Sequence, residues 1–207
     1  MNFIKNGLII ISIILFTGSC TLKHNPIVLS LNQPEDLYQT PNKMYIPQYD
    51  FLKHRKACIF RFSEPKYAPD MGKIAANYLY NELLKNEIFS NLTPELNIEN
   101  ISFDNLIEIA RAKKYDIIIS GDLLYYFNGN DLEKSRVDEQ IKIIMISDSK
   151  IETLWHAAAF ETAYPKKPID LLLFEIGGVP AQSSLKLMKK NATKFCNMIL
   201  SLSSKQK

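Results

Sequence analysis

The side chains that could do chemistry in this chain are three histidines, one serine–lysine pair and four acids. His24, His54 and His156 lie far apart, and none has a histidine or cysteine at the spacing that metal ligands use. Ser63 and Lys66 form a Ser-x-x-Lys sequence, in which serine would be the nucleophile and lysine its base. Because a proline lies between them, the pair belongs to a loop and not to the helix start that this chemistry requires. We therefore expect neither a metal site nor a serine–lysine site.

The four acids are Asp116, Asp122, Asp131 and Glu133. They could approach one another at the end of a strand and form an acid–base pair. The alternative, which the sequence favours, is that they are solubilising loop acids. The sequence has no nucleophile elbow, phosphate loop or dinucleotide fingerprint. We therefore expect a protein that is not an enzyme and uses no cofactor.

The stretch with the clearest chemical meaning is residues 15–20, which read Leu-Phe-Thr-Gly-Ser-Cys. They close an apolar run that follows Lys5, as in the charged and apolar parts of a secretory signal. The run is about half of the ~20 residues that a membrane-spanning helix needs, which disfavours the alternative of an uncleaved anchor helix. Two small residues before a cysteine resemble the lipobox of bacterial lipoprotein precursors.

The lipobox resemblance implies that residues 1–19 are removed and that Cys20 becomes a lipid-bearing first residue. Two or three acyl chains would hold the protein on a membrane permanently. Thr21 stands where an aspartate favours the inner membrane in enteric bacteria. The resemblance therefore implies the outer membrane, with the domain facing the periplasm, and leaves the inner membrane as an alternative.

The composition of the whole chain restricts the kinds of partner that it can bind. The 207 residues include 25 Lys and Arg against 22 Asp and Glu, a formal charge of +3. This balance is too small, and the basic pairs too scattered, to indicate nucleic-acid binding. Cys58 and Cys196 could form a disulfide in an exported protein. Both also fall on apolar faces that are typical of small buried hydrophobic residues, and their spacing leaves the two alternatives open.

The chain divides into three parts. Residues 1–19 are the expected signal peptide, residues 20–53 a lipidated tether or arm, and residues 54–203 a single α/β domain. The arm carries four prolines and little periodicity, which indicates a tether. It also carries too many apolar residues for a fully solvated linker, so part of it is expected to lie along the domain.

Hydrophobic patterns predict the elements of the domain. Alternation predicts a first strand over 56–62, with Cys58, Phe60 and Phe62 on one face. Trp155 lies in a late strand, where its expected role is in the core and stacking on a partner is the alternative. Helices are expected over 71–85, 102–113 and 181–202, with Asp70 and Ser102 as N-caps of the first two. A short strand is expected near 88–92, ending before Thr93-Pro94. Longer strands are expected over 115–127, 136–147 and 151–164, and the last two of these form a hairpin. This order predicts an α/β fold with helices packed on a mixed sheet.

Four segments resemble one superfamily of exported envelope domains: residues 57–62, the helix after them, residues 110–121 and the late hairpin that ends with residues 151–155. That group includes the N-terminal domain of TolB, the lipoprotein activator of penicillin-binding protein and the curli secretion lipoprotein. The resemblance covers about residues 55–200. Phe60-Arg61-Phe62 replaces the usual Leu-Pro-Phe, and Ser149-Lys150 replaces the usual Thr-Gly turn, which leaves the subfamily open.

The lipobox, the tether and the missing catalytic set together predict a membrane-anchored, non-enzymatic adaptor or assembly factor for an envelope protein complex. One alternative is a subunit of an outer-membrane secretion pore, as in the curli-type relatives, although the chain has only the hairpins that its own sheet requires. The other alternative is an enzyme that acts on the cell wall. That enzyme would need a site that the sequence does not show.

One strand is expected to border the partner surface. Tyr125, Tyr126 and Phe127 follow an apolar strand, so they place large side chains on both of its faces. Tyrosine is common at interfaces because its ring buries area while its hydroxyl stays hydrated. We expect these three residues to border a surface for a partner or for self-association. The alternative is that arm residues 38–45 fold over them.

Overall fold

The computed structural model describes residues 49–98, 102–147, 150–167, 169–171, 174–176 and 178–204. All of them belong to one unit of the chain, Tyr38–Lys207. The predictions for the signal peptide, Cys20, His24 and most of the arm fall outside the described residues. No helix among the described residues is long and apolar enough to cross a membrane.

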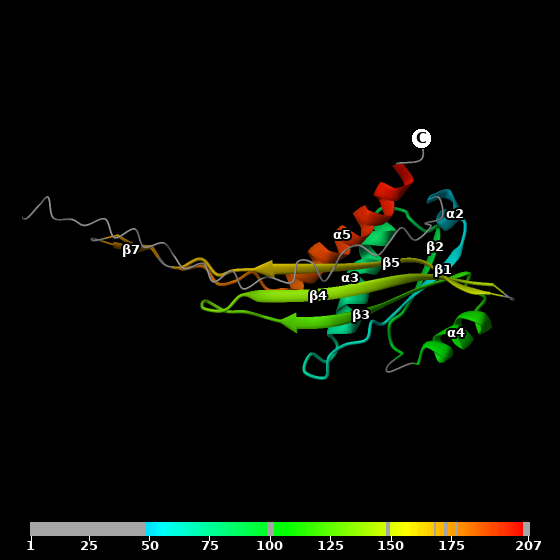
Figure 1. The fold of residues 1–207 in the computed structure, drawn as a ribbon, viewed down its shortest axis with the longest axis horizontal. Helices are drawn as coiled ribbons and strands as arrows, with labels where there is room; N and C mark the ends of the chain where they lie inside the picture. The colour runs from blue at the N-terminus through cyan, green and yellow to red at the C-terminus, as the bar shows by residue number, and fades with distance from the viewer. Residues whose placement is uncertain are drawn as a thin grey trace, which may run out of the picture. The chain divides into compact units, whose positions relative to one another are not determined.

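A mixed five-stranded sheet forms the centre of the domain. Its strand order is β2-β1-β3-β4-β5, with β1 parallel to both neighbours and β3, β4 and β5 antiparallel. A separate two-stranded hairpin joins β6 to β7. The elements are α2 (Tyr49–Lys53), β1 (Lys56–Phe60), α3 (Met71–Lys85), β2 (Asn91–Glu95), α4 (Phe103–Ala112), β3 (Ile117–Phe127), β4 (Ser135–Ile146), β5 (Ile151–Ala163), β6 (Ile169–Leu171), β7 (Phe174–Ile176) and α5 (Ser184–Ser204) (Figure 1). The predicted α/β class and the late hairpin are confirmed.

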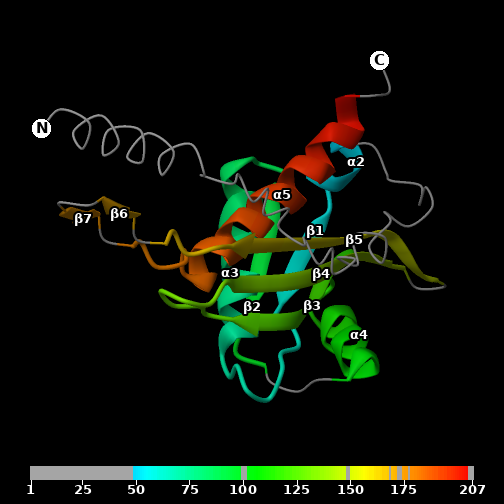
Figure 2. The ribbon, with the colours of Figure 1, turned by 60° about the vertical axis from the view of Figure 1, so that its left-hand side comes forward.

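Helices cover the two faces of the sheet unequally. α3 and α5 pack on one face, whereas α4 packs on the other near the start of β3 (Figure 2). Successive side chains of a strand point to opposite faces, so each strand contributes to both layers. The larger apolar cluster, under α3 and α5, includes Ala57, Ile59, Ile117, Ile119, Ile141, Ile143, Trp155, Leu187 and Phe195, and the smaller one, under α4, includes Cys58, Phe60, Ile107, Ile118, Ile144 and Ile146. The prediction that Trp155 lies in the core is confirmed.

The two cysteines are buried on opposite faces of the sheet. Cys58 of β1 belongs to the cluster under α4, and Cys196 of α5 belongs to the larger cluster. Both thiols are free. Burial raises the pKa of both, that of Cys196 to about 11. The disulfide alternative is therefore wrong, and the two residues act as small buried hydrophobic groups.

Two local predictions are corrected at the ends of elements. Asp70 occupies the N-cap position of α3, but its φ of 64° is left-handed and its side chain makes no capping hydrogen bond. Pro94 was expected to end a strand and instead lies inside β2. Because β2 is an edge strand with one partner, a residue without an N–H is tolerated there. Ser102 does cap α4, as its hydroxyl accepts from the Asn105 N–H at 3.3 Å.

The first strand ends earlier than predicted. β1 stops at Phe60, and Phe62 joins the larger cluster instead of the face that carries Cys58. A methyl group at Gly121 would come within 2.9 Å of the Phe62 ring, so the bare glycine makes room for this crossing. The short α2 and the β6–β7 hairpin were not predicted as a helix and strands, because each is too short to show periodicity.

Candidate functional site

The half of the sheet beyond α4 leaves one face without an apolar layer over it in the described structure. We call this surface the open face. It consists of Ser120, Asp122, Tyr125 and Phe127 of β3, Arg136, Asp138, Gln140 and Lys142 of β4, and His156, Ala158, Phe160 and Thr162 of β5, and none of these residues belongs to either apolar cluster. The register pairs Tyr125 with Asp138 and Phe127 with Arg136.

A bulge in β3 decides which aromatic residues reach the open face. The register with β4 shifts between Leu123 and Tyr125, so Leu124 is an extra residue. Regular alternation from the buried Leu123 would turn Tyr125 towards the core, and the bulge reverses this. Tyr125 and Phe127 are 40% and 38% exposed, whereas Tyr126 is partly buried and packs against the larger cluster.

Charged groups lie beside these aromatic rings. The Arg136 guanidinium lies over the Tyr125 ring, 5.7 Å from its centroid. It also donates to the Asp138 carboxylate: Nε to Oδ1 at 2.9 Å and to Oδ2 at 3.1 Å, and Nη2 to Oδ2 at 2.7 Å. Phe160 of β5 is 42% exposed, and Lys194 Nζ lies 5.8 Å from its ring centroid. An aromatic surface with a fixed ion pair suits recognition of another protein surface.

The middle of the open face is polar. Asp122 accepts a hydrogen bond from Gln140 Nε2 at 2.7 Å and another from the Ser63 hydroxyl. Burial and the neighbouring Lys142 lower the pKa of His156, while Asp122 acts in the opposite direction. This shift of the pKa favours the neutral form of the His156 imidazole. Its Nε2 atom is buried and has no hydrogen-bond partner in the described structure.

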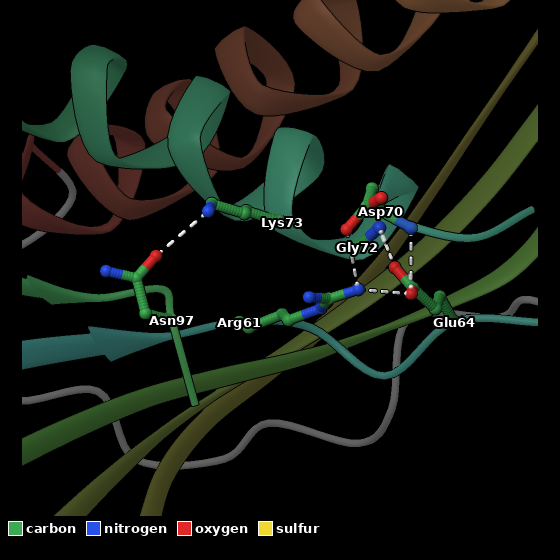
Figure 3. Close-up of polar contacts among 6 residues, drawn as sticks. All are labelled: Arg61, Glu64, Asp70, Gly72, Lys73 and Asn97. Carbon is green, nitrogen blue, oxygen red and sulfur yellow. Dashed lines mark hydrogen bonds and ion pairs between the residues drawn. The ribbon is translucent and has the colours of Figure 1, made fainter. Parts of the chain in front are cut away.

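A cavity of about 570 Å³ lies at the end of β1, next to the open face. Glu64 is one of the residues that line it. The Glu64 carboxylate accepts from the backbone N–H of Asp70 at 2.9 Å and of Gly72 at 2.6 Å (Figure 3). Arg61 Nη2 lies 2.5 Å from the same carboxylate and 3.2 Å from Asp70 Oδ1. The start of a helix attracts negative charge, and here the chain supplies that charge itself. The cluster therefore joins β1 to α3 and leaves no empty anion site at this helix start.

The structure separates the side chains that were considered for catalysis. Asp116 accepts from the Lys56 N–H at 2.9 Å where β3 begins. Asp122 lies six residues further along the strand, about 20 Å away at ~3.3 Å per residue. Asp131 and Glu133 belong to the turn after β3. The four acids therefore lie at the start of β3, within β3 and in the turn after it, and do not gather at one strand end as the acid–base alternative requires.

The remaining candidate groups are also apart. The Ser63 hydroxyl bonds Asp122 and not Lys66, which is part of the following loop. His54 is exposed after α2, whereas His156 lies in β5. Within the described ranges, no three His, Cys, Asp or Glu side chains are grouped so that they could hold a metal ion.

Sequence reasoning missed the residues that surround the aromatic pair. Arg136, Asp138 and Phe160 come from two other strands and meet Tyr125 and Phe127 only through the strand register. The alternation of β4 and β5 could have placed them on one face. It could not have placed them beside this part of β3, because a bulge and two pairings determine that position.

The fold is similar to that of PelC from Paraburkholderia phytofirmans. Two crystal structures of the PelC dodecamer align with a TM-score of 0.54 at 13% identity, covering 76% of this chain and 93% and 94% of theirs. At this identity the similarity concerns the fold alone. Lipoprotein GNA1162 from Neisseria meningitidis aligns with a TM-score of 0.39 at 9% identity, covering 70% of this chain and 99% of that chain, which is too loose to support an inference. No protein-family model matches the sequence, and no curated protein matches it. The superfamily expected from the sequence stays a prediction.

Proposed function

We propose that this protein is a lipid-anchored, non-enzymatic assembly factor of the bacterial cell envelope, and that it assembles with further copies of itself. The observation that carries the proposal is the aromatic end of the open face, formed by Tyr125, Phe127 and Phe160 around the Arg136–Asp138 ion pair. Large aromatic rings are enriched in the centres of protein interfaces, and exposed apolar area on one face indicates a contact surface.

Two further observations support this function. PelC, whose fold is similar, is a dodecamer in its crystal structures, which makes a second copy the first partner to consider. The lipobox-like sequence that ends at Cys20 supports attachment to a membrane, with the outer membrane as the proposed location. A different envelope protein as the partner is the alternative form of the same proposal.

The test is the size of the purified mature chain in detergent, measured by sedimentation velocity. We expect the unmodified protein to form oligomers. The double variant Tyr125→Ser and Phe127→Ser should be monomeric, with a melting temperature equal to that of the unmodified protein when both are measured below the concentration of self-association. The matched control is Leu84→Ser with Leu132→Ser, which changes two exposed apolar residues of α3 and of the turn after β3.

Two outcomes would contradict self-assembly. One is an unmodified protein that stays monomeric at every concentration, and the other is a patch variant that keeps the unmodified size. Crosslinking in cells from position 125 then decides between the two forms of the proposal. Reproducible capture of one other envelope protein supports the form of the proposal in which that protein is the partner. Capture of neither another envelope protein nor a second copy would contradict both forms.

A further inference from the structure

A second depression, of about 500 Å³, lies at the other end of the sheet, where β1 and β3 begin and β4 ends. Three cations line it: Arg55 before β1, and Arg111 and Lys114 at the end of α4. They come from segments that are more than fifty residues apart in the chain. The fold therefore gathers positive charge that the sequence shows only as scattered basic pairs.

The three cations of this depression outnumber the one acid that lines it. Arg55, Arg111 and Lys114 make no ion pair with any described residue, whereas nearby Lys113 lies 2.5 Å from Glu95. The acid in the depression, Asp116, uses its Oδ2 to accept from the backbone N–H of Lys56. The cations therefore have charge available for a ligand outside the chain.

Local structure accounts for part of this arrangement. The C-terminal end of a helix favours nearby cations, which explains why Arg111 and Lys114 are tolerated together. Lys114 has a left-handed φ of 56° as the chain leaves α4. The helix end does not account for Arg55, which belongs to another segment and is held by stacking on Phe51, 4.6 Å from the ring centroid. A third cation from elsewhere indicates a site for an anion.

The position of the tether indicates which anion. The chain between Cys20 and the first described residue, Tyr49, enters the domain a few residues before Arg55. Extended, that stretch reaches at most roughly 100 Å, so a lipid at Cys20 keeps the domain close to one membrane without holding it down. The high local concentration of phospholipid headgroups then makes even a weak contact effective.

We propose that the depression formed by Arg55, Arg111 and Lys114 docks onto the phosphate groups of anionic phospholipids in the membrane that carries the anchor. This inference rests on the proposed lipid attachment at Cys20. Three cations and Asp116 leave a net charge of +2 in the depression, which at ~1 kcal/mol per charge near an anionic surface favours the docked state by roughly thirtyfold. Docking orients the domain, which a tether alone does not.

The test uses the lipidated mature chain in vesicles. A fluorophore is attached at Ser147→Cys, on the rim of the depression, because Cys58 and Cys196 are buried and Cys20 carries the lipid. Quenching by a nitroxide on the lipid headgroup reports whether this rim touches the membrane. We expect strong quenching in phosphatidylcholine vesicles that contain phosphatidylglycerol, and its loss in high salt.

Charge variants make the test specific. Replacing Arg55, Arg111 and Lys114 together by glutamine should abolish the quenching, with the melting temperature as a check on folding. The matched control removes three charges elsewhere, from Lys134, Lys166 and Lys167, and should keep it. Equal quenching in the two triple variants, or equal quenching in vesicles without phosphatidylglycerol, would overturn the proposal. So would an acidic polypeptide that binds the depression while the membrane does not.

Failure of the anchor and failure of the docking give different results. If the protein incorporates no labelled fatty acid in cells, the proposed attachment is wrong. The mature chain with Cys20→Ser, added to anionic vesicles at higher lipid concentration, then still tests the depression. If that chain shows charge-dependent quenching, the depression docks onto the membrane even without the anchor. If the lipidated chain incorporates fatty acid but shows no charge-dependent quenching, the docking proposal is wrong and the proposed anchor stands.

Discussion

Glu64 shows how one side chain can do what the sequence assigned to another. Its carboxylate lies between Arg61 and the first backbone N–H groups of α3, where the sequence predicted Asp70 as the cap. A capping prediction considers the residue next to the helix. It misses an acceptor that arrives from six residues earlier through a loop, because that loop takes its shape from β1 and α3 together.

We predict that Glu64→Gln destabilises the domain by about 1–3 kcal/mol, because it removes a partly buried ion pair and weakens the cap of α3. Urea unfolding measures the change. Glu108→Gln, at an exposed position of α4, is the control and should alter stability by less than ~0.5 kcal/mol. Equal unfolding midpoints for the two variants would contradict the role given to Glu64.

A buried acid makes stability depend on pH. Glu139 of β4 is 3% exposed, and burial raises the pKa of its carboxyl to about 8, with Asp138 adding to the effect and a hydrogen bond from Asn191 opposing it. Between the ordinary pKa of 4.5 and this value, the folded chain keeps a proton that the unfolded chain has released. Stability is therefore full at low pH and falls as the pH rises through this range.

We predict that the free energy of unfolding decreases between pH 5 and pH 8 with a contribution from Glu139 of up to about 1.4 kcal/mol per pH unit. Glu139→Gln should remove this slope and make the protein more stable than the parent at pH 8. Glu152→Gln, at an exposed position of β5, should leave the slope in place. A parent and a Glu139 variant with parallel pH profiles would show that this carboxyl is not the source.

At the scale of elements, the bulge in β3 determines the orientation of the aromatic residues. The strand, its neighbours and the aromatic trio follow from alternation and from the turn after residue 127. Alternation does not predict which face of the sheet each aromatic residue occupies, because one extra residue at Leu124 exchanges the two faces. The position of Pro94 inside β2 was equally hard to predict, because a strand accepts a proline there only when it lies at the edge of the sheet.

We predict opposite effects for two adjacent tyrosines. Tyr126→Asp should lower stability by about 2–4 kcal/mol, because it places a carboxylate against the apolar cluster. Tyr125→Asp should change stability by no more than ~1 kcal/mol, because the lost stacking with Arg136 and the new carboxylate opposite Asp138 both lie at an exposed site. Thermal unfolding at a protein concentration below self-association measures both. The reverse order would show that the register of β3 has no bulge.

At the scale of the whole molecule, the two proposed surfaces lie at opposite ends of β3. The basic depression lies where β3 begins, and the aromatic end of the open face lies where it ends, about 35 Å away for a strand of 11 residues. If both proposals hold, β3 carries the assembly surface away from the membrane. The sequence predicted the anchor and the aromatic residues, but not the depression, because its three cations meet only in the folded chain.

We predict that Cys20→Ser abolishes incorporation of labelled fatty acid and leaves the precursor unprocessed at this site, because the thiol that takes the lipid is gone. Metabolic labelling and the shift in gel mobility measure both effects. Ser19→Ala keeps a small residue before the cysteine and should be processed and labelled as usual. Absence of label in the unmodified protein would contradict the proposed location.

The two buried thiols have a consequence for the exported chain that we propose. The folded sheet separates Cys58 from Cys196, and both thiols are shielded from solvent once β1 and α5 are in place. An unfolded chain that crosses into an oxidising compartment has no such barrier. A bond between the two sulfurs at that moment would tie together segments that belong on opposite sides of a sheet. If the chain is exported as we propose, we therefore expect the native fold to form only when folding precedes oxidation of these two thiols.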